Sequence, residues 1–280
     1  MATYKEYIAR VQMFASVKGL YTGPIDGLSG PGTAKALDAY PTIFAVGGIP
    51  AKEFLAFSEK RKVIAFCQTI FKTNGIDTGK IDGYAGTQTD WAFSQYAHLV
   101  ITGEKPPAVR NDEAAPDAGH PAPTNISDVP YERDMVKVYG TPGTNHTKIV
   151  SPYTLRIAWN PAQSVQAFAI HEECHDSALR AMNKVAARWS AAEIKANGFD
   201  LFGGCFNNRL KRGGTTLSIH AYAAAIDWSP ALNDLNTHKP KAQFSKEPGL
   251  EFLRIWESEG WFSLGLRRDY DYMHVQRCRI

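Results

Sequence analysis

Apolar residues recur every three or four positions along two stretches of the first hundred residues. The two runs consist of Ile8, Val11 and Phe14, and of Ile64, Cys67 and Phe71. This spacing places the apolar side chains on one face of a helix. Each run leads into a glycine-rich segment and then into helical sequence that begins with a threonine. The pattern therefore predicts the order helix, turn, helix, and predicts it twice.

The glycine-rich segments are two copies of one turn. The sequence T-G-P-I-D-G at residues 22–27 recurs as T-G-K-I-D-G at residues 78–83. Glycine allows a positive φ or a close approach of the backbone, and Asp26 and Asp82 can accept hydrogen bonds from nearby backbone N–H groups. We interpret residues 1–101 as a small all-helical domain built from two helix-turn-helix repeats.

A helical pattern also occurs in the second half of the chain. Its apolar positions are Val165, Phe168, Ala178, Leu179, Met182, Val185 and Trp189. We expect a helix from about Ser164 to Trp189.

This predicted helix contains the short zinc-binding motif H-E-x-x-H. On one helix face, His171 and His175 would be paired ligands and Glu172 a general base, with Glu193 available as a third ligand. The extended form of the motif fails, because neither the required Gly nor the third His follows at its position. We keep a zincin-type protease as an alternative and favour histidines that pack or hydrogen-bond on a supporting helix.

Residues 102–129 have the composition of a linker. Large apolar residues are almost absent, and five prolines stand among Ala, Asp, Gly and Asn. We therefore divide the chain into a domain at residues 1–101, a linker at 102–129 and a domain at 130–280, both domains being of ordinary size.

Composition and charge exclude several classes of function. The chain has 280 residues, and its net charge of +3 is too small to indicate a surface that binds nucleic acid. No apolar stretch is long enough for a membrane span, and four charged residues within the first 19 argue against a signal peptide. The four cysteines lack paired spacing. We expect a monomer that folds in a reducing cytosol, without membrane insertion or a nucleic-acid partner.

The strongest candidate for chemistry is a set of polar residues in the last third of the chain. His220 and Asp227 are seven positions apart, so they would face opposite sides of one strand and can share an ion only if the chain turns between them. A loop leading into a short strand satisfies this condition. With His274 they supply two imidazoles and one carboxylate, which leaves a fourth tetrahedral position for water, as in catalytic Zn²⁺ sites.

Three further residues fit the chemistry of a hydrolase. Asp271 precedes His274 by three positions and is the candidate general base towards a water that zinc has acidified. Arg209 and Arg212 come shortly before the first ligand and are the candidates for stabilising an oxyanion, with Arg209 preferred.

At these positions the second half resembles the zinc D-Ala-D-Ala carboxypeptidase and L-alanyl-D-glutamate endopeptidase family. The family pattern S-x-H-x-x-G-x-A-x-D, followed distantly by an acidic residue, two positions and His, is met at residues 218–227 and 271–274, except that Ala223 stands where the family usually has Gly. The resemblance covers residues 131–280 and within the family is most marked for phage endolysins. It implies an α+β domain in which a small antiparallel sheet, flanked by helices, carries the ligands.

The repeated turn of the first half resembles the peptidoglycan-binding module of wall hydrolases, which implies binding of the glycan strand. The two resemblances together predict an endolysin-like peptidoglycan hydrolase that cuts a bond of the stem peptide, with L-Ala–D-Glu favoured over D-Ala–D-Ala. Without a signal peptide, we expect it in the host cytoplasm and at the cell wall after release. The alternative is a wall-binding protein whose peptidase half is inactive, although the intact ligands and base argue against it.

Overall fold

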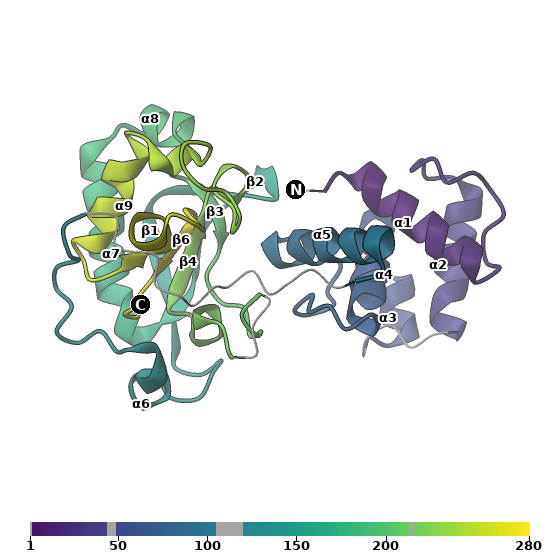
Figure 1. Ribbon diagram of the computed structural model, residues 1–280, viewed down its shortest axis with the longest axis horizontal. Coiled ribbons are helices and arrows are strands. Elements are labelled where there is room, and N and C mark those ends of the chain that lie inside the picture. The colour runs from purple at the N-terminus through teal and green to yellow at the C-terminus, as the bar shows by residue number, and fades with distance from the viewer. Residues whose placement is uncertain (1, 44–48, 105–119, 213–215) are drawn as a thin grey trace. The chain divides into compact units, whose positions relative to one another are not determined.

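The chain divides into two compact units, residues 1–107 (unit 1) and 108–280 (unit 2) (Figure 1). The computed structural model describes residues 2–43, 49–104, 120–212 and 216–280. Within these residues no helix combines the length and the apolar character that crossing a membrane requires.

Unit 1 is helical in the residues described. Its helices are α1 (Tyr4–Val17), α2 (Pro31–Ile43), α3 (Ala51–Leu55), α4 (Glu59–Thr73) and α5 (Thr87–Thr102). Every residue of α4 from Val63 to Phe71 is buried, and the helix packs against both α1 and α5. The two amphipathic runs of the sequence are α1 and α4, and each is followed by its glycine-rich segment and by a second helix, α2 or α5.

A buried glutamine organises the turn in each repeat. Gln12 Oε1 accepts the backbone N–H groups of Asp26 (3.1 Å) and Gly27 (2.9 Å), and its Nε2 donates to the Asp26 carboxylate (2.9 Å). Gln68, 56 positions later, makes the same three hydrogen bonds with Asp82 and Gly83. The two repeats therefore share a network of polar hydrogen bonds as well as a sequence motif.

The glycine that ends each turn is required by its surroundings. Gly27 and Gly83 have φ values of 70° and 76°. A Cβ atom would lie 2.6 Å from the carbonyl oxygen of Lys5 at the first and of Arg61 at the second. Since the turn lies directly against the backbone of the preceding helix, only glycine fits.

Unit 2 is a mixed α and β structure, and its strands form one sheet. They are β1 (His146–Ile157), β2 (Asn160–His171), β3 (Leu201–Gly204), β4 (Ala225–Trp228), β5 (Phe262–Ser263) and β6 (His274–Gln276). The spatial order is β2-β1-β3-β4-β6-β5. The expectation of a purely antiparallel sheet is wrong, because β1 and β3 pair in parallel; the part from β3 to β5 is antiparallel.

Helices and short 3₁₀ turns (η) complete unit 2. They are η1 (Glu132–Asp134), α6 (Met135–Tyr139), α7 (Glu172–Arg188), α8 (Ala191–Ala196), η2 (Ile219–Tyr222), η3 (Pro230–Leu232), η4 (Gln243–Ser245), α9 (Gly249–Glu257) and α10 (Leu264–Arg268). Helix α7 packs on β1 and also contacts α9 (Figure 1). The core between these layers includes Trp228, Trp256 and Trp261, all fully buried.

The predicted helix over residues 164–189 is half wrong. Residues 160–171 form β2, which pairs with β1 in an antiparallel hairpin, and the helix begins only at Glu172. The ring of Phe168 packs on Phe202 at a centroid distance of 4.6 Å. Hairpin pairing and this contact outweigh the local helical spacing, as tertiary packing often does.

The structure describes both ends of the segment 102–129 that we interpret as a linker, and at each end residues of this segment belong to a folded unit. Thr102 is the last residue of α5. At the other end Thr124 N donates to Glu257 O (3.1 Å) and Asp128 pairs with Arg277 (2.6 Å). Residues 120–129 thus pack on the rest of unit 2, while most of the remaining linker residues, 105–119, lie outside the described residues.

Candidate metal centre

Three segments of unit 2 bring His220, Asp227 and His274 together. His220 lies in η2, whose start is capped by the Ser218 hydroxyl, and Asp227 lies in β4. Between them Ala223 takes a φ of 53°, a left-handed conformation that favours glycine, so the chain turns as the seven-residue separation requires. In β6, His274 is the direct pairing partner of Asp227.

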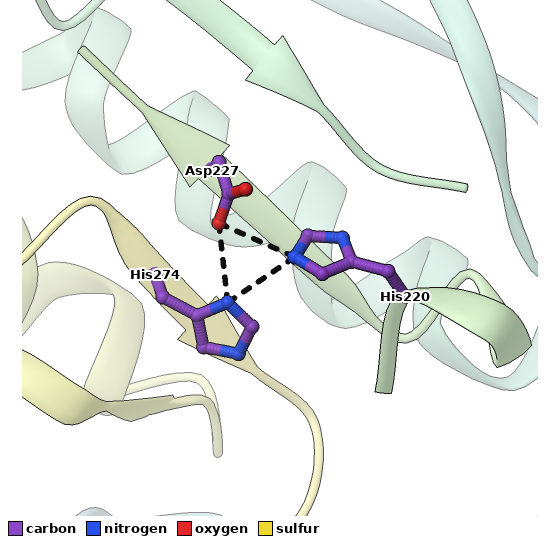
Figure 2. Close-up of side chains that lie close together, drawn as sticks. All are labelled: His220, Asp227 and His274. Carbon is purple, nitrogen blue, oxygen red and sulfur yellow. Dashed lines mark hydrogen bonds and ion pairs between the residues drawn. The ribbon is translucent and has the colours of Figure 1, made fainter. Parts of the chain in front are cut away.

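The three side chains converge on one point (Figure 2). Asp227 Oδ1 lies 3.3 Å from His220 Nε2 and 3.1 Å from His274 Nδ1, and the two nitrogens are 3.2 Å apart. Each residue is at most 4% exposed. We call this set the His-Asp-His cluster. It is the one group of three or more potential metal ligands found in the described part of the chain.

The outer ring nitrogens determine which atoms face the centre. His220 Nδ1 lies 2.7 Å from the carbonyl oxygen of Cys205, and His274 Nε2 lies 3.0 Å from Gln276 Oε1. Both partners are acceptors, so each outer nitrogen carries the proton and each inner nitrogen of a neutral ring presents its lone pair. Two lone pairs and a carboxylate oxygen therefore face one another at the centre.

This donor set fits a zinc ion. Ligands at ~2.0–2.1 Å in tetrahedral geometry are about 3.3 Å from one another, close to the separations observed. Imidazole and carboxylate are both zinc ligands, and the outer hydrogen bonds are those that orient metal-binding histidines in proteins. His220, Asp227 and His274 would hold the ion.

Electrostatics keep the cluster in the form that binds cations. Burial lowers the pKa of His220, since it disfavours the imidazolium ion more than Asp227 favours it. Burial raises the pKa of Asp227, but the two imidazoles outweigh burial and hold this pKa well below its ordinary value. Burial thus favours the neutral form of His220, and the Asp227 carboxyl is held in its ionised form.

The predicted catalytic residues line the same pocket. Asp271, Arg209 and Arg212 surround it together with the cluster, with Ser218, Leu235 and Met273. The pocket is small, with room for roughly one water molecule or ion. Both arginines and Asp271 are less than 10% exposed. Positive charge and a second carboxylate therefore lie beside the three ligands.

The zincin alternative does not form a ligand set. His171 is the N-cap of α7 rather than a helical residue; its Nδ1 accepts the Glu173 N–H and its Nε2 lies 3.0 Å from Tyr139 O. His175 pairs with the neighbouring Asp176 (2.8 Å). Glu193 closes a capping box at the start of α8. These three side chains have structural partners of their own, and Glu172 is exposed.

Two groups that orient the cluster were missed at the level of sequence. The Cys205 carbonyl is a backbone atom, which no side-chain pattern reveals. Gln276 had a usable signal, since a polar residue two positions after His274 on a predicted strand lies on the same face of the sheet.

Comparison of the chain with protein-family models, with curated proteins and with solved structures finds no match.

Proposed function

We propose that this protein is a zinc-dependent peptidase that cleaves the stem peptide of bacterial peptidoglycan. The observation that carries the proposal is the convergence of two imidazole lone pairs and a carboxylate, all buried, within 3.1–3.3 Å of one another. Three acceptors that face one another in a site of low dielectric repel one another, and a cation between them would offset this repulsion. A site with three protein ligands is typical of catalytic zinc rather than structural zinc.

Each neighbouring residue has a definite task in such a reaction. A bound zinc ion would supply an acidified water and polarise a peptide carbonyl. Asp271, in the same pocket, is the base that takes up the proton of the attacking water. Arg209 and Arg212 supply positive charge to the carbonyl oxygen as it becomes an oxyanion. The neutral form of His220 preserves its lone pair for the ion.

The substrate that we propose is inferred from unit 1. Its repeated T-G-x-I-D-G turn is the feature that resembles the peptidoglycan-binding module, so we assign unit 1 the glycan strand as ligand. A domain that binds the wall raises the effective concentration of the peptidase at an insoluble substrate. An endolysin-like enzyme acting after release from the host cytoplasm fits this arrangement, with the L-Ala–D-Glu bond favoured.

Purified cell walls provide the test. The protein should lower their turbidity and release new amino termini, lose both activities when zinc is removed with a chelator, and regain them when zinc is added. His220→Ala should be inactive and free of zinc, whereas His175→Ala, a matched change outside the cluster, should behave like the unmodified chain. Mass spectrometry of the released fragments identifies the bond cut. Zinc retained by His220→Ala, or intact walls with the zinc-loaded chain, would refute the proposal.

A further inference from the structure

Gln276 contacts the cluster from behind. It follows His274 by two positions on β6, so both side chains lie on one face of the strand. It is 4% exposed, and its Oε1 lies 3.0 Å from His274 Nε2, the ring nitrogen that points away from Asp227. Among the described residues, the Gln276 amide oxygen is the hydrogen-bond partner of that nitrogen.

The orientation of the Gln276 amide is fixed independently of the histidine. Its Nε2 donates to the carbonyl oxygen of Cys278 at 3.0 Å. A carbonyl oxygen can only accept, so the NH₂ group must face Cys278 and the amide oxygen must face His274. The acceptor presented to the imidazole is therefore determined by the backbone at the end of β6.

We propose that Gln276 is a positioning residue that selects the tautomer of His274. An acceptor at Nε2 requires the proton there and leaves the lone pair on Nδ1, directed at Asp227 Oδ1 (3.1 Å) and His220 Nε2 (3.2 Å). The same amide holds the plane of the ring against rotation. In its consequence for metal affinity this inference rests on the proposed function; the tautomer itself does not.

The two histidines are oriented by different means. His220 has the backbone carbonyl of Cys205 as its outer partner (2.7 Å), which no substitution removes. His274 has a side chain, which substitution can change. We therefore expect that the orientation of the His274 ring, unlike that of His220, can be changed by replacing one side chain, Gln276.

Nuclear magnetic resonance of ring nitrogens tests the tautomer directly. In the metal-free protein at about pH 8, His274 should be protonated at Nε2 and unprotonated at Nδ1. Gln276→Met, similar in size but without the amide oxygen, should show a mixture of tautomers. Gln276→Glu, which keeps an acceptor, should retain the Nε2 proton. A proton on Nδ1 in the unmodified chain would overturn the inference.

Zinc affinity gives a second measurement, independent of catalysis. Gln276→Met should bind zinc about 10–100-fold more weakly, the usual effect of removing the outer partner of a metal-binding histidine, and Gln276→Glu should keep most of the affinity. Equal loss in both variants, or none in Gln276→Met, would overturn the inference. Circular dichroism verifies that each variant is folded. If a variant does not fold, the tautomer of His274 measured in the unmodified chain decides whether the inference holds. If the unmodified chain binds no zinc, the proposed function fails, and the tautomer experiment still decides the role of Gln276.

Discussion

Unit 1 and unit 2 each bury a cluster of polar side chains, and the two clusters differ in their balance of donors and acceptors. Around Gln68 the acceptors meet donors: the amide oxygen takes two backbone N–H groups, and the amide nitrogen donates to Asp82, to Tyr84 O and to Thr89. In the His-Asp-His cluster two imidazole nitrogens and a carboxylate oxygen face one another, and with the protons on the outer ring nitrogens all three are acceptors.

The difference shows why burial alone does not identify a functional site. Gln68 is 1% exposed and Asp227 3%, so both side chains are removed from water to the same degree. A buried polar group whose hydrogen bonds are satisfied within the protein stabilises a fold. Acceptors held face to face cost free energy unless a cation joins them, which is the basis for the metal site proposed for the second cluster. The first cluster needs no ligand.

The largest effect that we expect is on the rate of catalysis at the His-Asp-His cluster. Asp271→Asn keeps the shape of the side chain and removes the proposed base, so the rate of peptide hydrolysis should fall by about 10²–10⁴-fold, with zinc content unchanged. Hydrolysis of a soluble stem peptide and metal analysis measure the two quantities. Asp269→Asn is the control. Asp269 and Asp271 both have a left-handed backbone conformation (φ 52° and 53°), but the Asp269 carboxylate accepts a hydrogen bond from the Tyr272 hydroxyl. A normal rate in Asp271→Asn would contradict the assignment of the base.

The next largest effect is on the stability of unit 1. Gln68→Ala leaves the partly buried N–H group of Asp82 and the buried N–H group of Gly83 without their acceptor, at about 1–3 kcal/mol for each unsatisfied group. We expect the free energy of unfolding to fall by ~3 kcal/mol in chemical denaturation followed by circular dichroism. Gln95→Ala, at a partly exposed position of α5, should change it by less than ~0.5 kcal/mol. Equal values for the two variants would mean that the network around Gln68 is not what stabilises the turn.

Elements with strong local signals could be predicted from the sequence. Helices α1 and α4 follow from apolar periodicity, and the repeated turn from its glycines. Strand β2 could not, because Val165 and Phe168 have the three-residue spacing of a helix and become a strand only through pairing with β1 and contact with Phe202. The mixed order of the sheet likewise depends on the long-range β1–β3 pair, which leaves no local pattern.

The convergence of the cluster was predictable in part. The separation of His220 from Asp227 indicated a turn between them, and the structure has one at Ala223. The orientation of the rings was not predictable, since it depends on the Cys205 carbonyl and on the amide of Gln276. Gln12 and Gln68 were overlooked, although they occupy equivalent positions 56 residues apart in the two repeats. A polar residue retained on the apolar face of both copies was a signal of a buried network.

Two glycine substitutions test the contribution of backbone geometry to the stability of unit 1 separately from that of its hydrogen bonds. Gly83→Ala should destabilise the unit by about 1–2 kcal/mol for the left-handed conformation, and more because the new Cβ would lie 2.6 Å from Arg61 O. Gly86→Ala, three residues on, meets no atom within 4 Å and has no positive φ, so thermal unfolding should be nearly unchanged. A tolerated Gly83→Ala would show that the turn can move away from α4 and that its position is not fixed by close contact.

The smallest effect concerns Glu259, a buried carboxylate with exposed cations as partners. Its side chain is 5% exposed and pairs with Arg180 (2.7 Å) and Lys184 (2.6 Å). Burial raises the pKa of Glu259, but the two cations outweigh burial and lower it below the ordinary 4.5. The stabilisation is therefore complete above about pH 4.5, the value in the unfolded chain, and is lost as the pH falls through the lower folded pKa.

Glu259→Gln tests this sign. At neutral pH the variant should melt about 2–4 °C lower, as expected for ~1 kcal/mol in a domain of this size. The difference should narrow below pH ~4.5 and vanish once the folded carboxyl is protonated. Tryptophan fluorescence follows unit 2, which holds five of the six tryptophans. A difference that persists in acid would indicate lost hydrogen bonds rather than lost charge, and would place Glu259 with Gln68, among buried groups that act through hydrogen bonds alone.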